Sequence, residues 1–139
     1  MGRFPLLCGA RKEAHALALP EAVLEDRPYP VRGLVAAGGN LTMEWPDSRR
    51  VREALRKLDF FLVIDVVRSP DCGHAHVVLP ACTFLERDEH RVNVYQNLPC
   101  ITLRRRVVEP VFGLPDQMIW VELARQMGFH VNNESDWTA

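Results

Sequence analysis

The feature that most constrains this chain is the run Phe60-Phe61-Leu62-Val63-Ile64-Asp65-Val66-Val67. It is almost continuously apolar and rich in β-branched residues, and Asp65 alone interrupts it. Such a run is typical of a strand that is buried on both faces of a parallel sheet. The sequence therefore predicts a central strand whose two faces are both covered.

The segments around this run alternate between strand and helix patterns. Residues 31–37 form a short apolar run closed by Gly38-Gly39-Asn40, and residues 76–80 form a third short strand. Between the first two lies a helix pattern over residues 49–58, with Asp47 as its N-cap or first-turn acid. Ser69-Pro70-Asp71 is expected to open a short helix before the third strand. This alternation predicts an α/β fold with a parallel sheet and right-handed crossovers.

The rest of the chain has weaker patterns. Residues 1–30 are predicted to be an irregular lead with a short helix from Pro20 to Leu24, and residues 129–139 a frayed tail. Residues 86–91 form a polar stretch, 101–108 an extended segment, and 116–127 an amphipathic helix ended by Gly128. The predicted domain therefore covers residues 31–128.

Composition excludes several classes of partner. The chain has 139 residues, 17 Lys and Arg, 18 Asp and Glu, and a net charge of −1, so neither nucleic acid nor an anionic membrane surface is favoured. No apolar run approaches the ~20 residues of a membrane-spanning helix. The four cysteines form no CxxC pair and no disulfide framework, which favours a reducing compartment, the cytoplasm for the isolated chain. A longer parent protein could be cytoplasmic or exported.

Two features at predicted strand ends are candidates for ligand binding. The Gly38-Gly39-Asn40 turn follows the first strand, and ligands of open α/β sheets bind at the carboxyl ends of strands. It fits neither the dinucleotide fingerprint nor the P-loop, so it is either an ordinary strand-to-helix turn or a place where the backbone approaches a phosphate or a ring edge. Asp65 either accepts hydrogen bonds from a guanine-like N–H and NH₂ edge or caps a neighbouring loop through backbone N–H groups.

Other groups of reactive side chains are less specific. The segment Cys72-Gly73-His74-Ala75-His76, with Cys82 and His90 further on, does not have an established zinc spacing, so no metal site is predicted. Arg104-Arg105-Arg106 is either a solvated face or an anion contact. Glu86 and Asp88 lie near one another without evidence of a shared acid/base site. No catalytic triad is recognisable, so no catalytic residue is assigned.

A series of motifs nevertheless resembles one family. The stretches PYPVRGLVAAGGNLTMEWPDSRRVREALRKLDFFLVIDVV and HVVLPACTFLERDE resemble the segments PYPIKAL…GGNP, EALxKLDF, VVxDxF and ADVVLPxxTxLE of the molybdopterin oxidoreductase superfamily, also called the dimethyl sulfoxide reductase family. RRVVEPVFGLPDQMIWVELARQMGF resembles a later segment of the same family. Together these motifs cover residues 28–130 in the family's order, which is far more specific than any one of them.

The resemblance implies a Rossmann-like three-layer domain with a short, mostly parallel sheet, present here as an incomplete domain. In the family this region holds the guanosine end of one molybdopterin guanine dinucleotide. Leu41 replaces a frequent Pro, and His76 replaces an Asp whose two-acceptor geometry a neutral imidazole does not copy. Carried over by position, the residues expected at the cofactor are Gly39, Asn40, Leu41, Glu44, Ile64, Asp65 and His76.

The resemblance also implies partners and a cofactor for a longer enzyme. The family's metal ligand and other domains have no counterpart here, so the chain resembles an internal fragment of a catalytic subunit, inactive by itself and without bound cofactor. Its expected partners are the remaining domains of that subunit and an electron-transfer subunit, and its metal is molybdenum or tungsten. Two alternatives remain: a stand-alone or self-associating α/β binding module, and an unrelated α/β nucleotide-binding enzyme.

Overall fold

A computed structural model describes residues 15–92 and 101–129 of the chain. The chain divides into two compact units, Met1–Leu79 and Pro80–Ala139. This division differs from the predicted one, in which a single domain spans residues 31–128, and those domain bounds stay a prediction. None of the helices within the described residues is long and apolar enough to cross a membrane.

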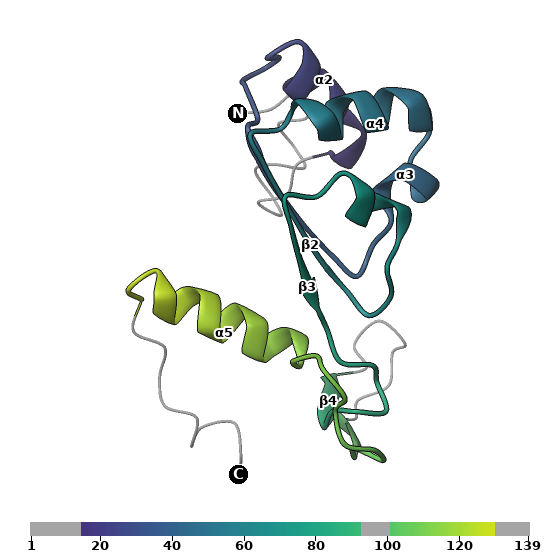
Figure 1. The fold of residues 1–139 in the computed structure, drawn as a ribbon, viewed down its shortest axis with the longest axis vertical. Coiled ribbons are helices and arrows are strands. Elements are labelled where there is room, and N and C mark those ends of the chain that lie inside the picture. Colours follow the sequence, from purple (N-terminus) through teal and green to yellow (C-terminus); the bar gives the residue numbers. More distant parts are fainter. Residues whose placement is uncertain (1–14, 93–100, 130–139) are drawn as a thin grey trace. The chain divides into compact units, whose positions relative to one another are not determined.

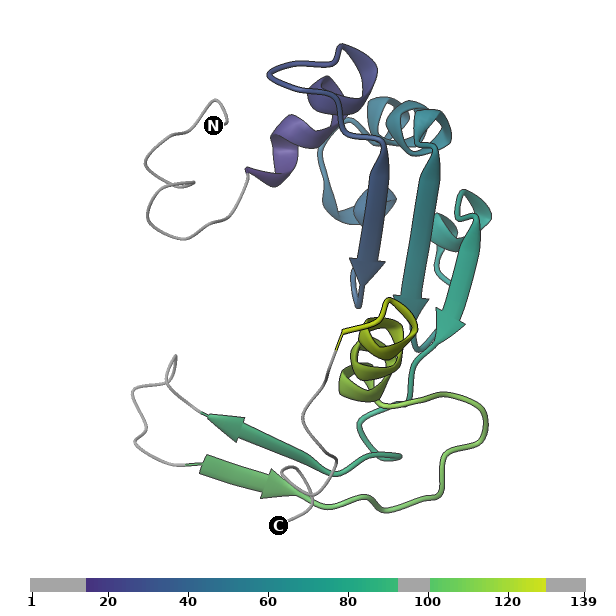
Figure 2. The ribbon, with the colours of Figure 1, turned by 90° about the vertical axis from the view of Figure 1, so that its left-hand side faces the viewer.

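The first unit is built on a three-stranded sheet in the order β1-β2-β3. Strand β1 (Gly33–Ala37) pairs in parallel with β2 (Phe60–Asp65), from Gly33 opposite Phe60 to Ala37 opposite Ile64. Strand β3 (Val77–Pro80) completes the sheet, and Figure 2 shows all three arrows pointing in the same direction. The predicted α/β class with a short parallel sheet is confirmed.

Short helices make the crossovers between these strands. Helix α3 (Leu41–Glu44) and helix α4 (Ser48–Lys57) connect β1 to β2, and the 3₁₀ helix η2 (Pro70–Gly73) connects β2 to β3. Figures 1 and 2 together show these three elements on the same face of the sheet, as right-handed crossovers require when consecutive strands are added in one direction. Helix η1 (Ala16–Ala18) and helix α2 (Leu19–Leu24) precede the sheet.

The core of this unit lies between the sheet and the helices. Four consecutive residues of β2, from Phe61 to Ile64, are buried, which confirms the prediction of a strand covered on both faces. Helix α2 confirms the predicted short helix, and its buried Val23 joins the core, so residues 15–30 are not only an irregular lead. The core cluster consists of Val23, Ala36, Val51, Ala54, Leu55, Leu58, Phe61 and Val63.

Asp47 begins helix α4 and supports a testable prediction. Its side chain accepts a hydrogen bond from the backbone N–H of Arg50 at 3.1 Å, and its φ of 54° lies in the left-handed region. Asp47→Ala removes the cap and leaves an alanine in that region, so we expect a loss of about 1–2 kcal/mol in the free energy of unfolding, measured by urea denaturation. Asp47→Asn keeps both a capping oxygen and tolerance of this conformation, and its loss should be well under half as large.

The second unit contains a hairpin and a helix. Strand β4 (Glu89–Val92) pairs antiparallel with β5 (Ile101–Arg104), with Glu89 opposite Arg104. The predicted polar stretch 86–91 thus contributes a strand. Helix α5 (Asp116–Gln126) matches the predicted amphipathic helix, and Gly128 follows it with φ of 81°. The predicted frayed tail lies, apart from residue 129, outside the described residues.

Glu86 holds two loops of this unit together. Its carboxylate accepts hydrogen bonds from the Thr83 backbone N–H and hydroxyl, both at 2.7 Å, and from the Val111 N–H at 3.1 Å. These bonds stabilise the charged form and hold the pKa of the Glu86 carboxyl below its ordinary value, with the Thr83 N–H contributing most.

The stability that Glu86 contributes should therefore depend on pH. Because the folded-state pKa lies below the unfolded one, the contribution is complete above the unfolded pKa and is lost as pH falls through the folded pKa. Glu86→Gln should lower the melting temperature at pH 7, and the difference from wild type should shrink steadily below about pH 4.3, the ordinary glutamate value. A difference that is constant from pH 7 to pH 3 would show that the charge of Glu86 does not matter.

Candidate functional site

The carboxyl ends of β1 and β2 meet at one edge of the sheet. The Gly38 N–H donates to the Ile64 carbonyl at 3.0 Å, which continues the pairing of Ala37 with Ile64 by one residue. Gly38 has φ of 63°, and this left-handed conformation turns the chain from β1 toward α3. The loop Gly38–Asn40 and the end of β2 at Asp65 therefore share this edge, as the sequence predicts.

The backbone donors where α3 begins are already engaged by carboxylates. The Asn40 N–H donates to Glu44 Oε1 at 3.1 Å. The Leu41 and Thr42 N–H groups donate to the two carboxylate oxygens of Asp71, at 2.5 Å and 3.1 Å. Three consecutive N–H groups at this helix start are thus satisfied from within the chain.

The side chains of Asn40 and Asp65 lie at this edge, and each keeps one polar group that could bind a ligand. The Thr42 hydroxyl donates to Asn40 Oδ1 at 3.0 Å, which fixes the side-chain amide of Asn40. Asp65 Oδ1 accepts the Val66 and Val67 N–H groups at 2.7 and 3.3 Å, so the interpretation of Asp65 as a loop cap is confirmed. Within the described residues neither the Asn40 amino group nor Asp65 Oδ2 has a hydrogen bond, so the cap does not exclude a ligand.

Leu41, Glu44 and Ile64 contribute differently from Asn40 and Asp65. The Leu41 side chain packs against the core cluster, and Ile64 is only 1% exposed, so neither presents a large side-chain surface at the edge. The Glu44 carboxylate folds back onto its own helix start, as described above. Gly39, Asn40 and Asp65 therefore lie together at this edge and remain accessible. The exposed Glu44 borders them, because its Oε2 lies 3.7 Å from the position that a Cβ on Gly39 would take.

His76 lies at the other end of the sheet. Its Nδ1 accepts the N–H of Phe61 at 2.9 Å, and its ring stacks on Phe60 with centroids 6.3 Å apart. Phe60 and Phe61 begin β2, whereas Asp65 ends it, and four residues of strand span about 13 Å. The prediction that His76 shares a ligand with Asn40 and Asp65 does not fit this geometry. The family resemblance places His76 just before a strand, and in a parallel sheet the beginnings of strands lie at the edge opposite their carboxyl ends.

Cys82, Glu86 and Asp88 are engaged in structural contacts. Within the described residues no group of three or more His, Cys, Asp and Glu side chains is arranged to hold a metal ion. Cys82 is buried, its thiol donates to the Gly113 carbonyl at 3.0 Å, and burial raises its pKa. Asp88 accepts a hydrogen bond from the Arg106 N–H at 2.8 Å, whereas Glu86 accepts from Thr83 and Val111. The two carboxylates therefore have different partners.

Two arginines of the basic triplet have acidic partners. Arg104 pairs with Glu89 across the hairpin and lies 5.2 Å from the centre of the Phe84 ring. Arg106 pairs with Glu109 at 2.8 Å. Of the two interpretations of this triplet, a solvated face with ion pairs agrees better with these contacts than an anion site.

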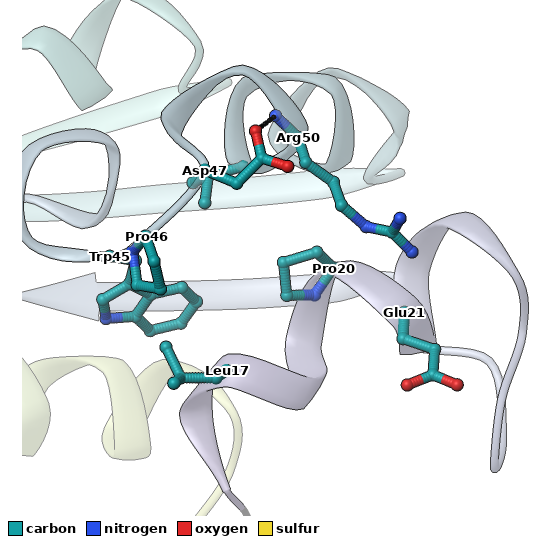
Figure 3. A pocket seen from close by; sticks show the side chains of 8 residues that line it. Leu17, Pro20, Glu21, Trp45, Pro46, Asp47 and Arg50 are labelled. Atoms are coloured by element: carbon teal, nitrogen blue, oxygen red, sulfur yellow. Dashed lines mark hydrogen bonds between the residues drawn. The ribbon is translucent and has the colours of Figure 1, made fainter.

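A separate hollow of about 260 Å³ lies among the helices of the first unit. Figure 3 shows Trp45 and Leu17 on one side of it and Pro20 and the Arg50 side chain on the other. None of the seven predicted site residues lines it. Its position on the helix side separates it from the edge formed by the strand ends.

Asp71 is the site residue that sequence reasoning missed. The only signal was its place in the predicted short helix Ser69-Pro70-Asp71, where an acid near a helix start is ordinary. Its partners lie 29 and 30 residues earlier in the chain. No local pattern encodes a contact across that separation.

Comparison with known proteins identifies the family. A family model described as molybdopterin oxidoreductase matches residues 8–126. The chain belongs to the molybdopterin oxidoreductase family. The solved structure of acetylene hydratase from Pelobacter acetylenicus is similar to it, with a TM-score of 0.69 and 29% sequence identity over 80% of this chain and 15% of that one.

Two curated members of the family agree with this assignment. The thiosulfate reductase molybdopterin-containing subunit PhsA of Salmonella typhimurium is 31% identical over 109 residues, which cover 78% of this chain and 14% of that protein. The F420-dependent formate dehydrogenase subunit alpha of Methanocaldococcus jannaschii is 31% identical over 113 residues, covering 81% and 16%. The chain thus spans about one seventh of the length of these relatives. Membership of this family implies a pterin cofactor with molybdenum or tungsten in the longer enzymes that contain such a region.

Proposed function

We propose that this chain binds the guanine end of a molybdopterin guanine dinucleotide within a molybdenum or tungsten oxidoreductase, and that it has no turnover alone. The observation that carries this proposal is the engagement of three consecutive N–H groups, those of Asn40, Leu41 and Thr42, by the carboxylates of Glu44 and Asp71. A helix start with free N–H groups favours a phosphate. Here those donors are occupied, and two negative charges beside them disfavour a phosphate.

An uncharged base with both donors and acceptors suits the same edge better. Guanine carries a ring N–H and an amino group on one edge, and acceptors at O6 and N7. Asp65 Oδ2 is a carboxylate acceptor for the first pair, and the Asn40 amino group is a donor for an acceptor of the base. Gly39 adds no side chain, and the Glu44 carboxylate, with Oε2 at 3.7 Å from the position of a Gly39 Cβ, borders the place proposed for the base. Adenine has no ring N–H on that edge, which gives a basis for selectivity.

The described residues fit the nucleotide end of the cofactor and not its metal end. When bound, the cofactor supplies electron transfer at its metal, whereas Gly39, Asn40 and Asp65 would orient the base that anchors it. The cofactor's remaining contacts would come from other domains of the catalytic subunit, with an electron-transfer subunit as a further partner. The chain's contribution is therefore binding and orientation.

The test is a thermal melt of the purified chain with GMP, with AMP as its control. A ligand at a concentration of about 100 times its Kd raises the free energy of unfolding by about 2.7 kcal/mol. For a domain of this size, this raises the melting temperature by roughly 5–10 °C. We expect a rise with GMP, none with AMP, and an affinity for GMP about tenfold weaker in Asp65→Asn, which loses a charged acceptor. Asp59→Asn changes the exposed acid just before β2 and should bind like wild type. Equal shifts with GMP and AMP would contradict the proposal.

A second candidate function, a self-associating module without catalysis, is favoured by exposed apolar side chains in the second unit. More than half of the surface is exposed for Ile101, Leu103, Val107, Val111, Phe112, Leu114, Met127 and Phe129. Large exposed apolar side chains in this number suit an interface with another protein surface. Sedimentation over a hundredfold range of concentration distinguishes the candidates, because only a self-associating chain changes its mass.

A further inference from the structure

Asp71 is a buried acid whose burial calls for an explanation. Its residue is 0% exposed, and it comes from η2, the short link between β2 and β3. Transfer of a carboxylate from water into a protein interior is costly unless hydrogen bonds or an opposite charge compensate. In the described part of the chain no Lys, Arg or His forms an ion pair with it. Its compensation is therefore the pair of backbone N–H groups at the start of α3.

Hydrogen bonds through Thr42 connect Asp71 to Asn40 at the accessible edge of the sheet. Asp71 Oδ1 holds the Thr42 N–H at 3.1 Å, and the Thr42 hydroxyl holds Asn40 Oδ1 at 3.0 Å. Thr42 is itself buried. The Thr42 hydroxyl thus fixes the oxygen of the Asn40 side-chain amide, and the amino group of that amide stays available to a ligand.

We propose that Asp71 is a positioning residue for the loop Gly38–Asn40: it sets the start of α3 and, through Thr42, the orientation of the Asn40 amide. This inference rests on the proposed function, since Asn40 is one of the residues assigned to the guanine base. Asp71 would not contact the ligand itself, but it would orient Asn40, which would. A loop held in advance does not have to be ordered on binding, which favours affinity.

The experiment uses the full chain labelled with ¹⁵N, as wild type, Asp71→Asn and the control Asp59→Asn. Asp71→Asn keeps the shape of the side chain but places an amino group against one of the two N–H donors. We expect the Leu41 and Thr42 amides to exchange with solvent about tenfold faster in this variant. Amides of β2 should stay within twofold of wild type, and GMP affinity should fall about tenfold. Asp59→Asn should change none of these quantities.

Two results would overturn the inference. One is unchanged exchange at Leu41 and Thr42, which would mean that Asp71 does not hold the loop. The other is faster exchange of all amides by the same factor, which would mean that Asp71 acts on the whole fold alone. If wild type binds no GMP, the proposed function fails, while amide exchange still reports whether Asp71 holds the loop.

A second variant tests the link independently of the folding of Asp71→Asn. Thr42→Val removes the hydroxyl that fixes Asn40 and keeps both the side-chain shape and the N–H that Asp71 binds. We expect weaker binding of GMP with unchanged exchange at Leu41, and Thr42→Ser should restore affinity. Wild-type affinity in Thr42→Val would overturn the proposed route from Asp71 to Asn40.

Discussion

Phe61→Ala is expected to lower the free energy of unfolding by about 3–5 kcal/mol, the range for removing a fully buried phenylalanine. Phe61 is 0% exposed and lies in the core cluster between β2 and α4. The loss has two parts, the transfer of apolar surface and the cavity that the neighbours fill only in part. A domain is stable by only about 5–15 kcal/mol, so this variant should be close to unfolded at 37 °C.

The adjacent residue provides the matched control. Phe60 lies in the same strand with its side chain on the opposite face, and it is 45% exposed. Phe60→Ala loses mainly the stacking on His76, worth about 0.5–1.5 kcal/mol for ring pairs. Urea denaturation followed by circular dichroism measures both variants. Equal losses for Phe60 and Phe61 would contradict the placement of the core on the helix side of β2.

Gly113→Ala is the second variant expected to have a large effect. A Cβ at this position would lie 2.7 Å from the Ala81 carbonyl carbon, 2.8 Å from its oxygen and 2.9 Å from the Cys82 nitrogen. All three are backbone atoms, so no side chain can rotate away. We expect a loss of about 3 kcal/mol, because the two segments must move apart.

The contacts that Gly113 permits give this prediction a local measurement. Ala81 and Leu114 form a parallel bridge, in which the Cys82 N–H donates to the Leu114 carbonyl at 2.9 Å. Amide exchange at Cys82 should therefore rise strongly in Gly113→Ala. Gly73→Ala is the control, since a Cβ there meets no atom within 4 Å and should change stability by less than about 1 kcal/mol. Unchanged exchange at Cys82 would contradict the predicted steric conflict.

The sequence predicted those parts of the fold that local patterns determine. The apolar run from Phe60 to Val67 predicts β2, because only burial on both faces tolerates so many consecutive apolar side chains. The strand is shorter than the run: it ends at Asp65, and Val66 and Val67 are exposed. Asp47 predicts the start of α4 through an interaction with a residue three positions later. The strand β4 was not predicted, because polar residues such as Glu89 and Arg91 suit an exposed hairpin as well as a loop.

The candidate site was predictable only in part, for the same reason. Asn40 and Asp65 follow strands directly, so strand order alone places them at one edge. Asp71 joins that edge through hydrogen bonds that depend on the path of η2, and His76 leaves it because a strand's beginning and end lie at opposite edges. Distinguishing these cases requires the direction and spacing of the whole sheet, which no window of sequence contains.

The pairing of Gly33–Ala37 with Phe60–Ile64 has a consequence for how this region tolerates insertions and deletions. One residue gained or lost at the start of β2 would turn Phe61 and Val63 out of the core, and one gained or lost at the start of β1 would do the same to Ala36. Either change would also shift Asp65 relative to the loop that carries Asn40. A residue gained between Trp45 and Asp47 lies outside the paired strands, so it would change neither the core residues of the strands nor the position of Asp65. Length variation that leaves the edge with Asn40 and Asp65 intact should therefore be confined to the connections between strands and helices. Natural variants with altered strand length should have lost the fold and the proposed binding together.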